Sequence, residues 1–358
     1  MSRKIRLERK LRERRERIRR EKHERRSLAF PLRELVPDDE VYFEEPDSSA
    51  GPTEPGLRLP SAFVMERSLR DLRRTMESHN FSCVKEANSC LGALSAGELK
   101  SMRAERLRKD PVEMAQELAY QAMEAQSPAS AESLARLALT LDPDCVDALV
   151  ELARLVAQSR QELIALLEKA VETGERVLGK EFFEENSGHF WNMIETRPYM
   201  RARESLAFSL LGGGHIEEAI GHLEAMLELN PNDNQGNRDT LLGRYLLTGR
   251  LQAADRLLAQ YDSDYSAIFK WGRVLERYLS GDCQGASDAL AEAREQNRHV
   301  EAYLTGRKSL PRRLPEYYSP GDEGEAVHCI ASLGEAWSQH FGAVRWLAGD
   351  RAASMTAG

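Results

Sequence analysis

The side chains best suited to recognition chemistry gather in one short stretch of this sequence. Between positions 188 and 201, imidazole, indole, carboxylate, phenol and guanidinium groups follow one another closely: His189, Trp191, Glu195, Arg197, Tyr199 and Arg201. Aromatic and arginine side chains are frequent anchors of protein–protein interfaces. The stretch is therefore a candidate partner-binding patch. The alternative is structural, with the aromatic rings filling a gap between helices and Glu195 pairing with an arginine.

Two further groups of side chains could contact a partner. Asn234, Gln235 and Arg238 stand at a predicted repeat junction. They either contact a peptide or serve as ordinary turn and cap residues. Tyr317 and Tyr318 lie in a segment that contains too many prolines to form a helix. That segment either packs against the repeats or lies along their groove as a bound peptide would.

No catalytic, cofactor or metal site is expected. His215 and His222 lie seven residues apart on one predicted helix and make a poor metal site. The glycines at 212–214 lack the Lys-Ser/Thr and the preceding strand of a phosphate-binding loop. The five cysteines form no C-x-x-C pair, which favours reduced thiols over a disulfide framework. An enzyme built from the groups at 188–201 is the least favoured hypothesis, since no nucleophile–base pair accompanies them.

The N-terminal arm, residues 1–28, is strongly basic, with fourteen Lys and Arg against five Glu. Its pattern predicts a helix that either stays in solvent, paired by its own glutamates, or binds an anion. The candidate anion-binding residues are Arg12, Arg14, Arg15, Arg19 and Arg20. Nucleic acid or the ribosome is the partner class that phosphate contacts would favour, and an acidic protein or an anionic membrane is the remaining alternative. No aromatic side chain in the arm is available to stack on bases.

Glycine and alanine recur at a fixed spacing in the second half of the chain. A glycine is followed five residues later by an alanine in three places: Gly214 and Ala219, Gly249 and Ala254, Gly281 and Ala286. The intervals of 35 and 32 residues are close to the roughly 34 of a tetratricopeptide unit. We therefore predict an all-α solenoid of helix-turn-helix repeats. The expected helix pairs are 112–143, 145–178, 198–231, 235–264 and 267–297.

The same patterns divide the whole chain. The expected parts are a basic arm at 1–28, an acidic proline-rich disordered linker at 29–60, a helical lead-in at 61–110, repeats at 111–297 with an insert at about 179–197, a Pro/Tyr-rich segment with capping helices at 298–348, and a disordered tail at 349–358. Ser95 with Glu98 predicts a capping box. Ser319, with Pro320 at the first helical position, predicts the start of a capping helix.

Several longer motifs resemble one known family. They are Gly188-His-Phe-Trp, Glu195-Thr-Arg-Pro-Tyr-Met-Arg-Ala, Leu229-Asn-Pro-Asn-Asp-Asn-Gln-Gly, His299-Val, Tyr303-Leu-Thr-Gly-Arg and Pro315-Glu-Tyr-Tyr-Ser-Pro-Gly-Asp-Glu. In this order they are similar to the suppressor-of-tumorigenicity-7-like family of tetratricopeptide proteins, in particular its bacterial members, over roughly residues 110–348. The resemblance implies a repeat scaffold without an established chemistry.

These observations predict a non-enzymatic scaffold that binds a peptide or a partner helix in the groove of its repeats. The alternative is an RNA- or ribosome-associated factor that uses the basic arm. No stretch of about 18 apolar residues is present, so no transmembrane helix is expected. The predicted location is the cytoplasm, because the N-terminus has no apolar signal region.

Overall fold

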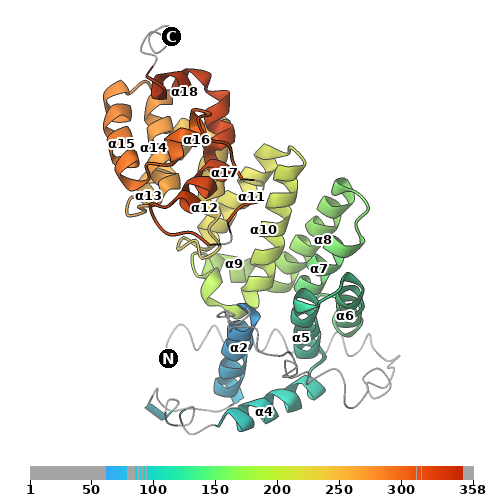
Figure 1. The fold of residues 1–358 in the computed structure, drawn as a ribbon. Helices are drawn as coiled ribbons and strands as arrows, with labels where there is room; N and C mark the ends of the chain where they lie inside the picture. Colours follow the sequence, from blue (N-terminus) through green and yellow to red (C-terminus); the bar gives the residue numbers. More distant parts are fainter. Residues whose placement is uncertain are drawn as a thin grey trace, which may run out of the picture. The chain divides into compact units, whose positions relative to one another are not determined.

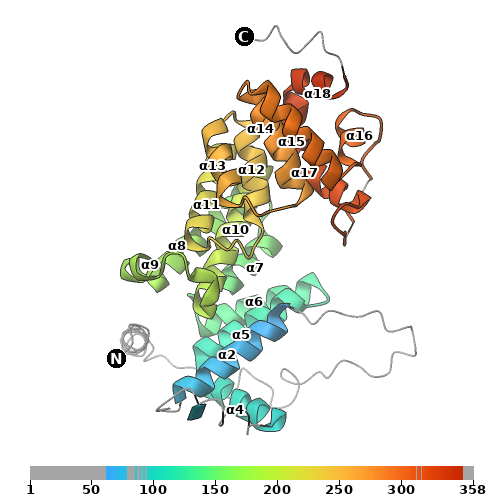
Figure 2. The ribbon, with the colours of Figure 1, turned by 90° about the vertical axis from the view of Figure 1, so that its left-hand side faces the viewer.

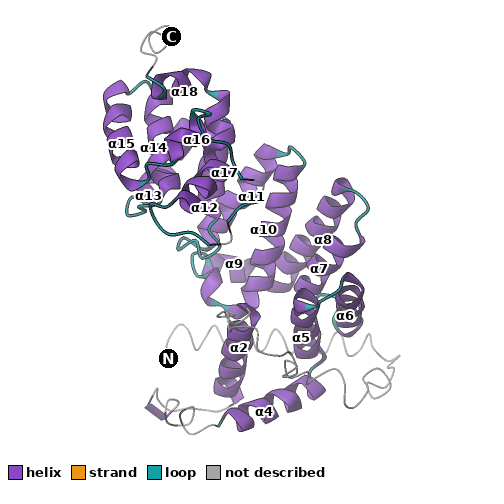
Figure 3. Ribbon diagram, in the orientation of Figure 1, coloured by secondary structure: helices purple, strands orange, loops and turns teal. Residues whose placement is uncertain are grey.

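The computed structural model describes residues 62–78, 85–86, 89, 92, 95–311, 313–315 and 317–349. These residues form helices joined by turns and loops, and none of them belongs to a strand (Figures 1 and 3). The predicted basic arm at 1–28, the predicted linker at 29–60 and residues 350–358 of the predicted tail lie outside the described residues.

Five helix pairs follow one another between residues 111 and 296 (Figures 1 and 2). They are α5 (Pro111–Glu124) with α6 (Pro128–Leu141), α7 (Val146–Val156) with α8 (Arg160–Leu178), α10 (Arg197–Gly212) with α11 (Ile216–Leu229), α12 (Asn237–Leu247) with α13 (Leu251–Gln260), and α14 (Ala267–Leu279) with α15 (Cys283–Gln296). The two helices of each pair are in contact, and the second helix of each pair contacts the first helix of the next pair. The fold is the predicted all-α solenoid of tetratricopeptide type.

The turns and helix starts follow from residue type. Gly214, Gly249 and Gly281 have φ values of 81°, 70° and 79°, a conformation that glycine adopts without a steric penalty. The alanine five residues after each of them is completely buried, because a methyl group lets two helices approach closely. Pro111 and Pro128 open their helices directly after side-chain caps from Asp110 and Ser127.

Short helices interrupt the array between α8 and α10. They are α9 (Lys180–Asn186) and two 3₁₀ turns, η2 (Phe190–Asn192) and η3 (Ile194–Thr196). Their rings form a cluster in which Phe190 lies 4.9 Å from Phe183 and 6.2 Å from Tyr199, between ring centroids. Phe190 is completely buried and Tyr199 is 1% exposed. The aromatic residues of the insert therefore form a core where the repeat pattern is broken.

Three helices follow the last pair: α16 (Val300–Leu304), α17 (Glu323–Gln339) and α18 (Phe341–Leu347). α17 packs on α12 and α14, the first helices of their pairs. The approach is so close that a Cβ added at Gly243 would overlap the carbonyl oxygen of Ser332. Trp337 of α17 meets Trp271 of α14 edge to face, with both rings buried. α17 thus covers apolar surface of the first helices in the last two pairs.

The predicted start of this capping helix is wrong. Its N-cap is Asp322, whose carboxylate accepts the Glu325 N–H at 2.8 Å, and not Ser319. Gly321 has a φ of 82°, which a helix cannot include, so helical residues begin only after it. The Ser95–Glu98 capping box is confirmed, at the start of α4 (Ala96–Lys109).

Candidate helix-docking face

The helix α2 (Ala62–Ser78) lies against α5 although it belongs to none of the pairs (Figure 2). One face of α5 carries a side chain at each i, i+4, i+7 and i+11 position: Glu113, Glu117, Tyr120 and Glu124. Residues at this spacing share one face of a helix. We call this surface the acidic face of α5.

Arginines of α2 pair with the acidic face along its length. Arg67 binds Glu117 at 3.0 Å and Glu124 at 2.8 Å. Arg70 donates to the Tyr120 hydroxyl at 3.3 Å, and Arg74 forms an ion pair with Glu113. Because hydrogen-bonded ion pairs fix both position and orientation, these contacts define the register of α2 on α5.

A buried charge cluster joins α2 to two further helices. Glu66 is 4% exposed and Asp147 of α7 is 1% exposed. Arg201 of α10 binds both, at 3.0 Å and 2.6 Å. Tyr120 donates to Glu66 at 2.7 Å, and Gln116 donates to Asp147 at 2.6 Å. Each buried carboxylate therefore has an arginine and a neutral donor as partners.

The electrostatics of this cluster favour its charged forms. Burial by itself would raise the pKa of Glu66, but the positive charge of Arg201 and the hydrogen bonds from Arg201 and Tyr120 lower it below its ordinary value. Burial would likewise lower the pKa of Arg201, yet Asp147 and Glu66 raise it well above the usual value. The cluster thus holds its ions through their mutual attraction.

α2 turns its apolar side away from the helices that hold it. Its buried side carries charges, whereas the large apolar residues are between 37% and 69% exposed: Val64, Met65, Leu69, Leu72 and Met76. Only Phe63 packs inward, stacked on Tyr120 with ring centroids 5.2 Å apart. The attachment of α2 therefore rests mainly on ion pairs and hydrogen bonds, with little burial of apolar surface.

The predicted residues at 188–201 divide between this cluster and the aromatic core. Glu195 pairs with Arg73 of α2. Arg197 lies 3.6 Å from Glu66, donates to the carbonyl of Trp191 at 3.1 Å, and covers the half-buried ring of that tryptophan. Tyr199 belongs to the buried ring cluster, and His189 is exposed before η2. Three of the six candidates, Glu195, Arg197 and Arg201, therefore come together against α2.

The other predicted groups lie near α12 and α17. Asn234 is exposed and Gln235 is half-buried in the turn before α12. Arg238 binds Asp264 at 2.8 Å and Asp233 at 3.4 Å. Tyr317 is 77% exposed, and Tyr318, 49% exposed, packs on His328 of α17. The predicted arm residues Arg12, Arg14, Arg15, Arg19 and Arg20 lie outside the described residues. A partner-binding role for these groups stays a prediction.

Sequence reasoning missed the acidic face of α5 and the arginines of α2 that meet it. The signal was present in the spacing of Glu113, Glu117 and Glu124 along one predicted helix. Their partners in α2 are 39 to 57 positions away in the chain. No local pattern links residues at such a separation.

Asp239 of α12 provides a pH-dependent element beside Arg238. Burial, more than the neighbouring carboxylates of Asp264 and Asp233, raises its pKa to about 7, and the charge of Arg238 opposes this rise. One of its carboxylate oxygens is buried with no hydrogen-bond partner among the described residues. The native state therefore keeps a proton that the unfolded chain releases near pH 4.

We expect the free energy of unfolding to fall by about 1 kcal/mol between pH 6 and pH 8. In this range Asp239 is already ionised in the unfolded chain, so raising the pH removes a proton that stabilises only the native state. Asp239→Asn should remove this decrease and should be the more stable protein at pH 8. Urea unfolding of both proteins at the two pH values measures the difference. An equal decrease in the variant would contradict the assignment to Asp239.

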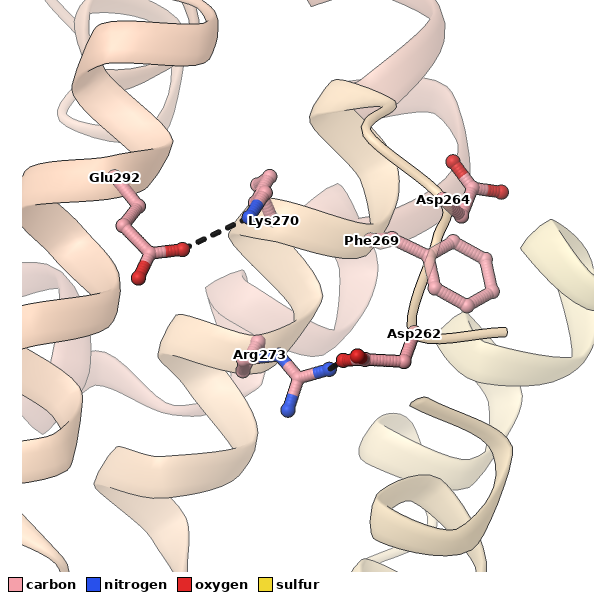
Figure 4. Close-up of a pocket in the computed structure, with 6 residues that line it drawn as sticks. All are labelled: Asp262, Asp264, Phe269, Lys270, Arg273 and Glu292. Atoms are coloured by element: carbon pink, nitrogen blue, oxygen red, sulfur yellow. Dashed lines mark hydrogen bonds and ion pairs between the residues drawn. The ribbon is translucent and has the colours of Figure 1, made fainter. Parts of the chain in front are cut away.

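A polar hollow on α14 offers no comparable site. Figure 4 shows that it is lined by Asp262, Asp264, Phe269, Lys270, Arg273 and Glu292. Lys270 binds Glu292 at 2.8 Å and Arg273 binds Asp262 at 3.2 Å, across its two sides. Both cations of the hollow are thus paired with its own carboxylates.

Comparison with known proteins adds two structural likenesses. The chain matches no protein-family model and no curated protein. It is similar in structure to tetratricopeptide-like repeats proposed to belong to a kinesin light chain of Podosopora anserina, with 17% sequence identity and a TM-score of 0.34 over 52% of this chain and 94% of that one. A single-residue variant of that protein is similar at 16% identity and a TM-score of 0.32, over 56% and 98% of the two chains.

Within the part of the chain that the structure describes, no helix has the length and apolar character needed to cross a membrane.

Proposed function

We propose that this protein is a non-enzymatic scaffold that holds a partner helix against the first helices of its repeats. The observation that supports the proposal is the attachment of α2, which is bound by side chains from α5 and α10, while Asp147 of α7 holds Arg201 in place. Helices that bind other helices through one face are a recurring mode of protein recognition. α17 supports the same view, since it also lies on first helices, those of the fourth and fifth pairs.

The negative charges of the acidic face indicate which kind of helix could bind to it. Glu113 and Glu117 lie one turn apart and Glu124 lies two turns further on. These glutamates pair with Arg74 and Arg67 of α2. Arginine can bind a carboxylate with two parallel hydrogen bonds. We therefore propose that the partner is an arginine-rich helix. α2 occupies the acidic face and would compete with such a partner for it. α2 can be displaced because its apolar side is exposed and it is held mainly by ion pairs.

The test is binding of a fluorescent peptide with the sequence of residues 62–78 to the full chain. In the variant Arg67→Gln, Arg70→Gln, Arg74→Gln, which we call the α2-release variant, α2 loses its pairing with the acidic face. We expect the peptide to bind this variant at least about tenfold more tightly than the unaltered chain. Adding Glu113→Gln and Glu117→Gln should abolish the gain, and the affinity should fall as salt rises.

The matched control is Arg136→Gln, Arg176→Gln, Arg294→Gln. It removes the same charge from arginines that are 59%, 62% and 48% exposed elsewhere on the chain. It should bind the peptide no better than the unaltered chain. Equal binding to all variants, or binding that ignores Glu113 and Glu117, would rule the proposal out.

A further inference from the structure

The N-terminal arm repeats the part of α2 that the acidic face holds. Shifting residues 7–19 by 58 positions places them on residues 65–77 with five identical residues. The identical pairs are Glu8 and Glu66, Arg9 and Arg67, Leu11 and Leu69, Arg12 and Arg70, Arg15 and Arg73. Similar pairs are Leu7 and Met65, Glu13 and Asp71, Ile18 and Met76.

The matching residues are those that bind. Glu66, Arg67 and Arg70 contact Arg201, Glu117 and Tyr120 respectively, and Arg73 contacts Glu195. Asp71 pairs with Arg106 of α4, and the arm has a glutamate at that position. At two exposed positions of α2, the arm has Lys10 for Ser68 and Arg14 for Leu72. Both changes place a longer charged side chain in solvent.

Two differences fall on contacts. The first is Arg17 where α2 has Thr75, which is 1% exposed, so a long charged side chain meets a buried position. The second is Glu16 where α2 has Arg74, the partner of Glu113. A glutamate there meets the like charge of Glu113. The arm therefore lacks the free energy that the Arg74–Glu113 ion pair contributes to the binding of α2. We therefore expect the arm to bind the acidic face more weakly than α2 does, with the remaining contacts retained.

We propose that the acidic face of α5 also receives residues 7–19 of the arm of a second copy of this chain. Reciprocal exchange would place each arm on the other copy, the two-fold arrangement that homodimers most often adopt. Two contacts form together, so the second is favoured by the high effective concentration that the first creates. For the arm to occupy the face, this gain must exceed the advantage that α2 has from being attached to its own face, which the concentration series below measures. The arm has a net charge of +9, so it is attracted to acidic surfaces before contact.

This inference rests on the proposed function and specifies its partner. The first test measures binding of two fluorescent peptides, residues 5–21 and residues 62–78, to the α2-release variant of the full chain. The arm peptide should bind at least about tenfold more weakly than the α2 peptide, because one ion pair is replaced by a repulsion and Arg17 stands in place of the buried Thr75. It should lose its binding when Glu113 and Glu117 are glutamines. A peptide with the arm residues in scrambled order should not bind.

The second test measures the mass of the full chain by sedimentation across a concentration series. We expect a dimer that becomes a monomer in Arg9→Glu, Arg12→Glu, Arg15→Glu, which alters the shared register. The matched control Arg20→Glu, Arg25→Glu, Arg26→Glu changes the charge equally outside that register and should remain a dimer. Each sample is measured with and without nuclease.

The outcomes separate the two proposals. If the α2 peptide binds and the arm peptide does not, the arm inference fails and the proposed function stands. If neither peptide binds, the proposed function itself fails. A chain that is monomeric at every concentration, or that dissociates equally in both arm variants, overturns the second copy as occupant. A dimer that disappears with nuclease shows instead that the arm binds nucleic acid.

Discussion

Replacing Arg201 by glutamine is expected to lower the free energy of unfolding by about 3–5 kcal/mol. The substitution leaves Glu66 and Asp147, both less than 5% exposed, without the cation that they share. A buried carboxylate that loses its cation must take up a proton or draw in water, and both cost free energy. Arg201→Lys should recover only part of the loss, since one ammonium group cannot form the two-sided contacts that the guanidinium makes.

Urea unfolding monitored by circular dichroism measures the effect of this substitution. Arg176→Gln is the control: it breaks an ion pair with Asp144 in which the arginine is 62% exposed. Such surface pairs contribute about 0–1 kcal/mol. If Arg201→Gln cost no more than Arg176→Gln, the buried cluster would not be what ties α2, α7 and α10 together.

Trp337→Ala should cost about 3–5 kcal/mol, the usual range for a large aromatic side chain removed from a core. The ring is 1% exposed and lies with its centroid 6.3 Å from that of Trp271, at an interplanar angle of 63°. Truncation leaves a cavity between α17 and α14. Because each helix in a solenoid is stabilised only by its neighbours, the loss should be concentrated in the C-terminal pairs.

Hydrogen exchange resolved along the chain can locate this loss. Amides of α12, α14 and α17 should exchange faster in Trp337→Ala, while those of α5 to α8 should change little. Phe341→Ala is the matched control, since its ring, in the next helix, is 68% exposed. We expect that variant to unfold within about 0.5 kcal/mol of the unaltered chain. Uniformly faster exchange along the whole chain would argue against the local effect.

The repeats could be predicted from the sequence because their signals are local. A glycine with positive φ and an alanine at a helix crossing are each required by the geometry of one turn, so Gly249 and Ala254 identify their pair without further information. The stripe of α17 from Ala326 to Trp337 was predictable for the same reason, as a period of 3.6 residues. Its start was not, because Ser319 is followed by a glycine that breaks the helix.

The docking of α2 could not be predicted in this way. Its apolar residues have the spacing of a helix that faces a core, yet Met65 and Met76 are exposed and the charged side faces inward. The acids that satisfy this side come from other helices, so the preference appears only when those helices are in place. Arg201 illustrates the difficulty: a recognition role was predicted for it, and the structure places it between two buried carboxylates of its own chain.

The contacts of α2 also have a consequence for the order in which the chain folds. Most contacts in the pairs join neighbouring helices, and such short separations favour rapid folding. α2 is different, because Glu66 and Arg201 are 135 positions apart. During synthesis α2 is complete long before α10 exists, so its charged side lacks Arg201 until more than a third of the chain has been added. Of the described helices, α2 is the first to be made, yet its contacts are complete only when α10 has been made.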